Sequence, residues 1–320
     1  MFLKRAASCG SNYVSMSLGS LLCSAVACLA IVPFGFAQAV LAPAELTLRA
    51  SASEVRVTFT TDRNGRILST VQPGDFAVVD QDRVVRDFRS FTRSEYTRLD
   101  VAVLVDMSGS ITPKFRQKLS SIVDQFAHDE ALPGNSLSVI SFRGLKPTLL
   151  CDRNCRDLNF SAHFPAAGSA DQTPLHDSIV FASQLLARRS DPQTRKIVIL
   201  FSDGADTISL HSFTDTLDTA IDEEVAIYSV DSGDSSHPSS GSPVLRTLAA
   251  GTGGRYFPLD AGPAKILDAV LADSRTTYTV AYKLPSPAAG FHLVRVLPTH
   301  DLDLQFHCRR GYYYPGDSGN

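Results

Sequence analysis

The segment VAVLVDMSGS, residues 101–110, decides the fold. It opens with five consecutive apolar residues and turns polar at Asp106. A short, continuous apolar run is typical of a strand that is covered on both faces, as in a parallel sheet between helices. Three further runs of this kind follow along the chain. The four expected strands are 101–105, 137–142, 197–201 and 226–230.

Between these runs the apolar residues recur at helical spacing, as Phe115, Leu119 and Phe126 do. Alternation of strands and helices predicts an α/β fold with a doubly wound, mostly parallel sheet. The expected helices are 115–126, 175–186, 212–223, 243–250 and 263–272.

Two β segments flank this region. In the first, Val55, Val57 and Phe59 alternate with polar residues, and Asn64-Gly65 is a hairpin signal. In the second we expect strands at 278–282, 293–297 and 302–308, the last carrying Cys308 toward a core. We expect the two segments to pack as one small β module with the α/β domain inserted between them. The expected divisions are 1–39, 40–98, 99–275, 276–314 and a disordered tail at 315–320.

The first 39 residues have the layout of a secretory signal peptide. Lys4 and Arg5 precede a long apolar stretch, and Ala37-Gln38-Ala39 has the small residues of a cleavage site. An uncleaved membrane anchor is the alternative, because the apolar stretch is long; a lipoprotein reading at Cys28 is weaker. The preferred prediction is an exported protein, secreted, periplasmic or on the cell surface, with no membrane span in its mature form.

The composition bears on two questions, whether nucleic acid is a partner and whether the chain forms a disulfide. The chain has 320 residues, a formal net charge of −3 and no clustering of Lys and Arg, which argues against nucleic acid as a partner. After cleavage only Cys151, Cys155 and Cys308 remain. In an oxidising compartment Cys151 and Cys155 are candidates for a disulfide that closes the loop CDRNC, since a zinc site would need more ligands.

Polar side chains gather where the expected strands end. Asp106, Ser108 and Ser110 alternate directly after the first strand, and Asp203 follows a later one. Thr173 precedes a helix, where an ordinary N-cap is the alternative reading. Ligands of open α/β sheets bind at the carboxyl ends of the strands, so these side chains are expected to converge at one rim.

Two carboxylates and three hydroxyls form a site of hard oxygen ligands. Such a set selects Mg²⁺, or Mn²⁺ or Ca²⁺, over zinc or copper. A water position on the cation is open to exchange, so an acidic side chain of a protein ligand is the expected partner.

The segments DMSGS (106–110), TPL (173–175) and FSDGAD (201–206) resemble the metal-ion-dependent adhesion site of von Willebrand factor type A domains. The resemblance covers about 99–273 and implies that Asp106, Ser108, Ser110, Thr173 and Asp203 are the metal ligands. It also implies one antiparallel edge strand, with the CDRNC loop close to it. The flanking segments PGDFAVVDQDR (73–83) and CRRGYYYP (308–315) are similar to those of secreted bacterial proteins that carry this domain.

The sequence gives little support for an enzyme, because the motifs of several enzyme families are incomplete or missing. Ser108 stands where a haloacid-dehalogenase-like phosphatase would need its second aspartate, and the sequence has neither a P-loop nor a His-Glu-x-x-His motif. No catalytic residue is therefore assigned. The predicted function is a cation-dependent adhesion or protein-binding module. A scaffold that binds proteins without metal is the alternative.

Overall fold

The structure is a computed structural model that describes residues 54–64, 66–67, 70–94, 98–128, 137–153, 155–163, 172–190 and 194–316. The expected signal peptide at 1–39 and residues 317–320 of the expected tail lie outside this range.

A six-stranded sheet forms the centre of the α/β domain, in the order β11-β10-β9-β6-β7-β8. Its first five strands are mutually parallel, and β8 is antiparallel to β7 at one edge. The bounds are β6 (Arg98–Asp106), β7 (Leu137–Arg143), β8 (Lys146–Cys151), β9 (Thr194–Ser202), β10 (Val225–Asp231) and β11 (Tyr256–Phe257). The doubly wound α/β fold and its antiparallel edge strand are therefore confirmed.

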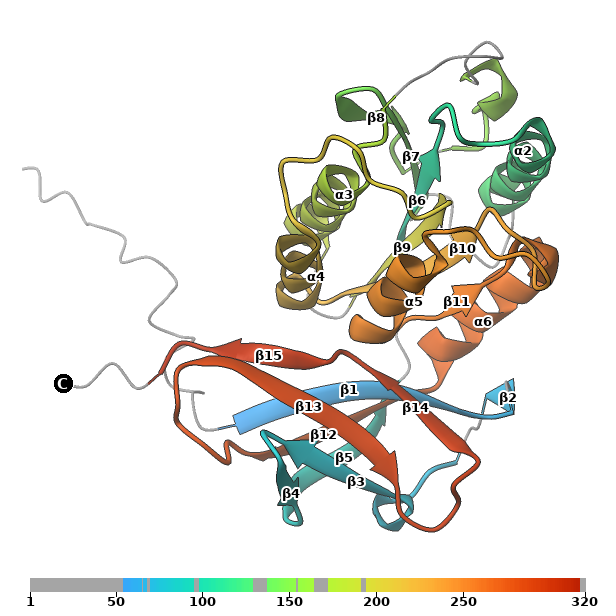
Figure 1. Ribbon diagram of the computed structural model, residues 1–320. Coiled ribbons are helices and arrows are strands. Elements are labelled where there is room, and N and C mark those ends of the chain that lie inside the picture. The colour runs from blue at the N-terminus through green and yellow to red at the C-terminus, as the bar shows by residue number, and fades with distance from the viewer. Residues whose placement is uncertain are drawn as a thin grey trace, which may run out of the picture. The chain divides into compact units, whose positions relative to one another are not determined.

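Helices cover both faces of this sheet (Figure 1). Alternate residues of β6 point to opposite sides, so Val101, Val103 and Val105 enter one core, and Ala102 and Leu104 enter the other. The helices α2 (Pro113–His128) and α6 (Pro263–Arg275) pack on the first face. The second face carries α3 (Leu175–Arg189), α4 (Phe213–Asp222) and α5 (Ser242–Gly251).

The flanking β segments form two further sheets with a shared apolar core. One sheet has the order β14-β1-β12-β5, with β2 paired to β1, and the other has the order β15-β13-β3-β4. The first contains β1 (Glu54–Arg63), β2 (Arg66–Ile67), β5 (Phe88–Ser94), β12 (Thr277–Lys283) and β14 (Leu304–Cys308). The second contains β3 (Phe76–Asp80), β4 (Arg83–Val85), β13 (Gly290–Pro298) and β15 (Gly311–Tyr314). Because β1 pairs with both β12 and β14, the expected pairing of the two segments is confirmed.

One strand limit in the β module was wrong. The alternation predicts a strand from Leu302, but β14 begins at Leu304 and Leu302 is 82% exposed. The side chain of Asp301 accepts a hydrogen bond from the backbone N–H of Asp303, and this local turn replaces strand pairing there. Cys308 does face the apolar core of the module, and burial raises the pKa of its thiol to about 11.

A disulfide joins Cys151, the last residue of β8, to Cys155, with a Cα–Cα distance of 5.6 Å. It closes the loop next to the antiparallel edge strand, although Asn154 within that loop is outside the described residues. None of the helices in the described ranges is long and apolar enough to cross a membrane.

Candidate metal centre

Asp106 is the last residue of β6, and its side chain is fully buried. Its Oδ1 accepts a hydrogen bond from the backbone N–H of Ser108 at 2.9 Å. Its Oδ2 accepts one from the hydroxyl of Ser202 at 2.8 Å. Removal from water raises the pKa of Asp106 to about 6, and the negative charge of Asp203 acts in the same direction. The centre is therefore built around a carboxylate that is costly to ionise without a nearby cation.

Ser108 and Ser110 lie in the loop that follows Asp106. Ser108 is fully buried, whereas Ser110 is exposed, and their hydroxyl oxygens are 3.0 Å apart. The loop then enters α2, where the hydroxyl of Thr112 accepts a hydrogen bond from the backbone N–H of Phe115, as an N-cap does. The structure thus brings the three first-loop residues together, with one hydroxyl facing outward.

Asp203 directly follows β9, the neighbour of β6 in the sheet. Its Oδ1 accepts a hydrogen bond from the backbone N–H of Ala205 at 2.9 Å, which fixes the side chain against its own loop. Gly204 next to it has φ +78°, and a Cβ there would lie 2.4 Å from the carbonyl oxygen of Gly241. Only glycine fits this close approach of two loops, and it sets the path of the chain beside Asp203.

Ser202 belongs to the same cluster, although nothing in the sequence singled it out. The β6–β9 register pairs Val105 with Phe201, so Asp106 and Ser202 come next on adjacent strands. The hydroxyl of Ser202 donates to Asp106 and accepts from the backbone N–H of Gly204. It therefore ties the first loop to the loop of Asp203, a link that only the strand register reveals.

Thr173 is buried and contacts the loop of Asp203 through its backbone. Its N–H donates to the hydroxyl of Thr207 at 2.7 Å, and its carbonyl oxygen accepts from the N–H of Thr207 at 2.9 Å. Across the described chain, no hydrogen bond joins the hydroxyl of Thr173 to Asp106 or Asp203. The structure thus joins the second and third loops through backbone contacts, and direct contact of Thr173 with the two acids stays a prediction.

The first turn of α3 takes its caps from the third loop. Asp206 accepts a hydrogen bond from the backbone N–H of His176 at 3.2 Å, and Ser209 accepts one from that of Asp177 at 3.1 Å. The helix thus obtains its acceptors from Asp206 and Ser209, and the N-cap alternative for Thr173 is not what the structure shows. Asp206 itself is a capping residue, not a freely solvated acid.

Two other acids near the rim differ from each other. Asp234 is half-exposed and accepts hydrogen bonds from the backbone of its own loop. Asp231 is fully buried. Its carboxylate accepts from the N–H groups of Gly233 and Ser239 and from the hydroxyl of Tyr256. Neighbouring groups of the chain therefore already supply hydrogen bonds to the Asp231 carboxylate.

The charge balance of the centre fits a divalent cation. Within the part of the chain that the structure describes, neither Asp106 nor Asp203 forms an ion pair. No group of three or more His, Cys, Asp and Glu side chains there has the arrangement of a metal site, so a nitrogen- or sulfur-rich site is not seen. Two carboxylates with flanking hydroxyls are instead a set of oxygen donors that suits Mg²⁺, Mn²⁺ or Ca²⁺.

Comparison with solved structures gives several similar chains. The manganese-loaded TRAP protein of Plasmodium vivax has 15% identity over 71% of this chain and 98% of its own, with a TM-score of 0.41. An aerotolerance-related membrane protein of Bacteroides fragilis has 12% identity over 54% and 96%, with a TM-score of 0.41. Proximal thread matrix protein 1 of the mussel byssus has 17% identity over 61% of this chain, with a TM-score of 0.41, and the match spans about half of that protein (51%). At this level these likenesses carry no functional argument.

No curated protein sequence matches the chain. The model of the von Willebrand factor type A domain family matches residues 101–205, about a third of the chain. All five predicted ligand residues, from Asp106 to Asp203, fall inside the matched segment. The chain therefore contains a von Willebrand factor type A domain.

Proposed function

We propose that this chain is an exported, metal-ion-dependent adhesion or protein-binding module and not an enzyme. Asp106, Ser108, Ser110, Thr173 and Asp203 are proposed to hold one divalent cation at the carboxyl rim of the central sheet. The ligand is a protein that offers an acidic side chain. Export rests on the signal-peptide pattern of residues 1–39.

The observation that carries this proposal is the state of Asp106. Its carboxylate is fully buried, has Asp203 close enough to raise its pKa, and meets only neutral donors among the described residues. Burying a lone negative charge is unfavourable, and folded proteins normally offset it with a partner of opposite charge. A divalent cation is the partner that the surrounding oxygen atoms would also bind.

The residues of the chain have separate tasks in this proposal. Asp106 and Asp203 supply the negative charge, and Ser108, Ser110 and Thr173 add neutral oxygen atoms that leave much of the cation's charge unneutralised. Mg²⁺, Mn²⁺ or Ca²⁺ bound there would supply an open position for a carboxylate oxygen of the protein ligand. The hydrogen bonds of Ser202 and Thr207 keep the three loops in place for this.

The first experiment measures cation binding by the full mature chain. We expect 5 mM Mg²⁺ to raise the Tm by about 3–6 °C, because a ligand that binds only the folded state stabilises it. The Asp106→Ala protein should show no shift. Asp234→Asn, which removes a charge from a half-exposed acid after β10, is the matched control and should keep the full shift. No Mg²⁺ shift in the wild-type protein would contradict the cation site.

The second experiment tests capture of an acidic ligand. Two synthetic peptide sets that differ only in Glu or Gln at one position are immobilised, and binding of the chain is measured in Mg²⁺ and in EDTA. Preference for Glu that disappears in EDTA and in Asp106→Ala supports the proposal. Capture that survives both changes would favour the metal-independent scaffold.

A further inference from the structure

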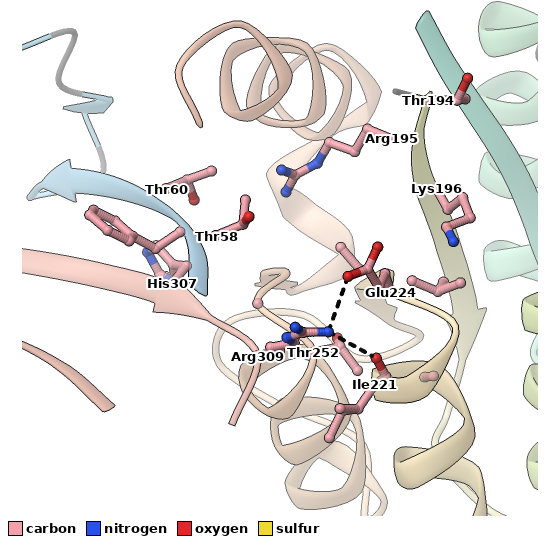
Figure 2. A pocket seen from close by; sticks show the side chains of 15 residues that line it. Thr58, Thr60, Thr194, Arg195, Lys196, Ile221, Glu224, Thr252, His307 and Arg309 are labelled. Carbon is pink, nitrogen blue, oxygen red and sulfur yellow. Dashed lines mark hydrogen bonds and ion pairs between the residues drawn. The ribbon is translucent and has the colours of Figure 1, made fainter. Parts of the chain in front are cut away.

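A small cavity lies at the opposite end of the central sheet from the metal centre. Its volume is about 100 Å³, and it is lined by the beginnings of β9 and β10 and by β1 and β14 of the β module. The metal centre follows the other end of β9, nine residues or roughly 30 Å away along the strand. The cavity, whose lining is drawn in Figure 2, is therefore separate from the metal centre.

The walls of this cavity are polar because of strand alternation. Val57 and Phe59 of β1 enter the core of the β module, so Thr58 and Thr60 lie on the other face, toward the cavity. His307 of β14 is paired directly with Thr60 and lies on the same face. Figure 2 shows these three side chains together on one side of the cavity.

The lining carries net positive charge. Arg195 and Lys196 come from β9, and Arg309 follows β14, whereas Glu224 is the only acid that lines the cavity in the described chain. The guanidinium of Arg195 points toward the side formed by the threonines (Figure 2). Arg309 pairs with Glu224 at 3.3 Å, but the Glu224 side chain is 64% exposed, so this pair is well screened by solvent. The lining therefore holds three basic side chains and one acid, and of the three Arg195 and Arg309 already have partners within the chain.

A buried hydroxyl gives independent evidence for a ligand. Thr60 is 1% exposed, and its Oγ1 has no hydrogen-bond partner among the described residues. Leaving a buried hydroxyl unsatisfied is unfavourable, so such groups in folded proteins normally meet a partner. Because Thr60 lines the cavity, a ligand there that met this hydroxyl would supply the missing partner.

We propose that this cavity binds a small tetrahedral oxyanion, inorganic phosphate or sulfate. Guanidinium groups match the oxygen atoms of such anions in charge and geometry, and a hydroxyl adds a neutral donor. A space of about 100 Å³ is large enough for a single oxyanion. Because the cavity residues come from both modules, the anion would join the β module to the type A domain.

The test uses the full mature chain in EDTA, so that its outcome does not depend on the metal centre. We expect 10 mM phosphate or sulfate to raise the Tm by about 2–4 °C over chloride at the same ionic strength. Titration calorimetry should give saturable binding of one anion. Glycerol phosphate is included as a bulkier source of the same group, and the size of the cavity predicts weaker binding for it.

Two variants examine the residues that carry the proposal. Thr60→Val keeps the shape of the side chain and removes the unsatisfied hydroxyl, so we expect an unchanged or higher Tm in chloride and about 5- to 10-fold weaker phosphate binding. Thr61→Val is the matched control. Thr61 is equally buried and also lacks a partner in the described chain, but it lies on the opposite face of β1. It should keep the phosphate affinity of the wild-type protein.

Lys196→Gln should weaken phosphate binding by about 10-fold, whereas Lys146→Gln, an exposed position on β8, should leave it unchanged. Equal Tm values in phosphate, sulfate and chloride would overturn the proposal. So would a Thr60→Val protein that binds phosphate as tightly as Thr61→Val.

Discussion

Two of the regions that contain buried acids differ in whether a positive charge lies beside the acids. At the carboxyl rim of the central sheet, Asp106 is surrounded by neutral hydrogen-bond donors and by another acid. At the junction with the β module, Asp62 and Asp273 share one basic residue, Arg255. Among the described residues, the first region has no basic side chain paired with its acids, whereas the second has one.

The junction network is complete within the chain itself. Arg255 donates to Asp273 through two nitrogen atoms, at 2.7 and 2.8 Å, and to Asp62 at 2.5 Å. The hydroxyl of Tyr228 also donates to Asp273, and His307 contacts Asp62 at 2.7 Å. Burial of an acid therefore does not by itself indicate a metal centre. The informative feature of Asp106 is burial without a positive partner together with a second acid, Asp203, close by.

Removing the shared base should have the largest effect. Arg255→Met leaves Asp62 and Asp273 buried, with side-chain exposures of 3% and 0%, and without their main positive partner. We expect a loss of about 3–5 kcal/mol in the free energy of unfolding, measured by urea denaturation in EDTA. A loss below about 1 kcal/mol would show that the network does not hold the two modules together.

Removing the charge of the unpaired Asp106 should raise the free energy of unfolding, which is the opposite of the effect expected for Arg255→Met. The folded-state pKa of Asp106, about 6, is above its ordinary value of 3.8, so the folded state binds the proton more tightly than the unfolded state. The stabilising contribution of this group is complete below about pH 4 and is lost as the pH rises through 6. Asp106→Asn avoids that loss.

We therefore expect Asp106→Asn to stabilise the cation-free protein by about 1–3 kcal/mol at pH 7.5 and to have little effect at pH 4. Urea denaturation in EDTA at the two pH values measures this difference. An asparagine variant that is less stable than the wild type at pH 7.5 would mean that the buried charge is already compensated within the chain.

The distance along the chain between interacting residues explains which of these features the sequence could predict. The run from Val101 to Asp106 specifies a buried strand and its polar end locally, because side-chain pattern and chain order carry that information. Asp106, Ser108 and Ser110 are close in sequence, so their proximity in the fold follows directly. The bond of Ser202 to Asp106 depends instead on the register between β6 and β9, which no local pattern encodes.

The junction network was beyond prediction for the same reason. Asp62 and Arg255 are 193 residues apart, and each looks like an ordinary surface charge in its own segment. The burial of Asp231 could not be predicted either, because it arises from Tyr256 and from the loop around Ser239, which pack on it only in the folded chain. Local periodicity specifies elements, whereas partners of buried polar groups depend on how the elements assemble.

The smallest effect is expected where an acid is paired but exposed. Arg63 and Asp301 form an ion pair in the β module, with side-chain exposures of 49% and 33%. Water screens both charges and the long arginine side chain loses entropy in the pair, so Arg63→Met should change the free energy of unfolding by less than about 1 kcal/mol. Urea denaturation beside Arg255→Met compares the same substitution at an exposed and a buried pair. If the two losses were equal, burial would not be the property that separates these acids, and the argument that Asp106 needs a cation because it is buried would lose its basis.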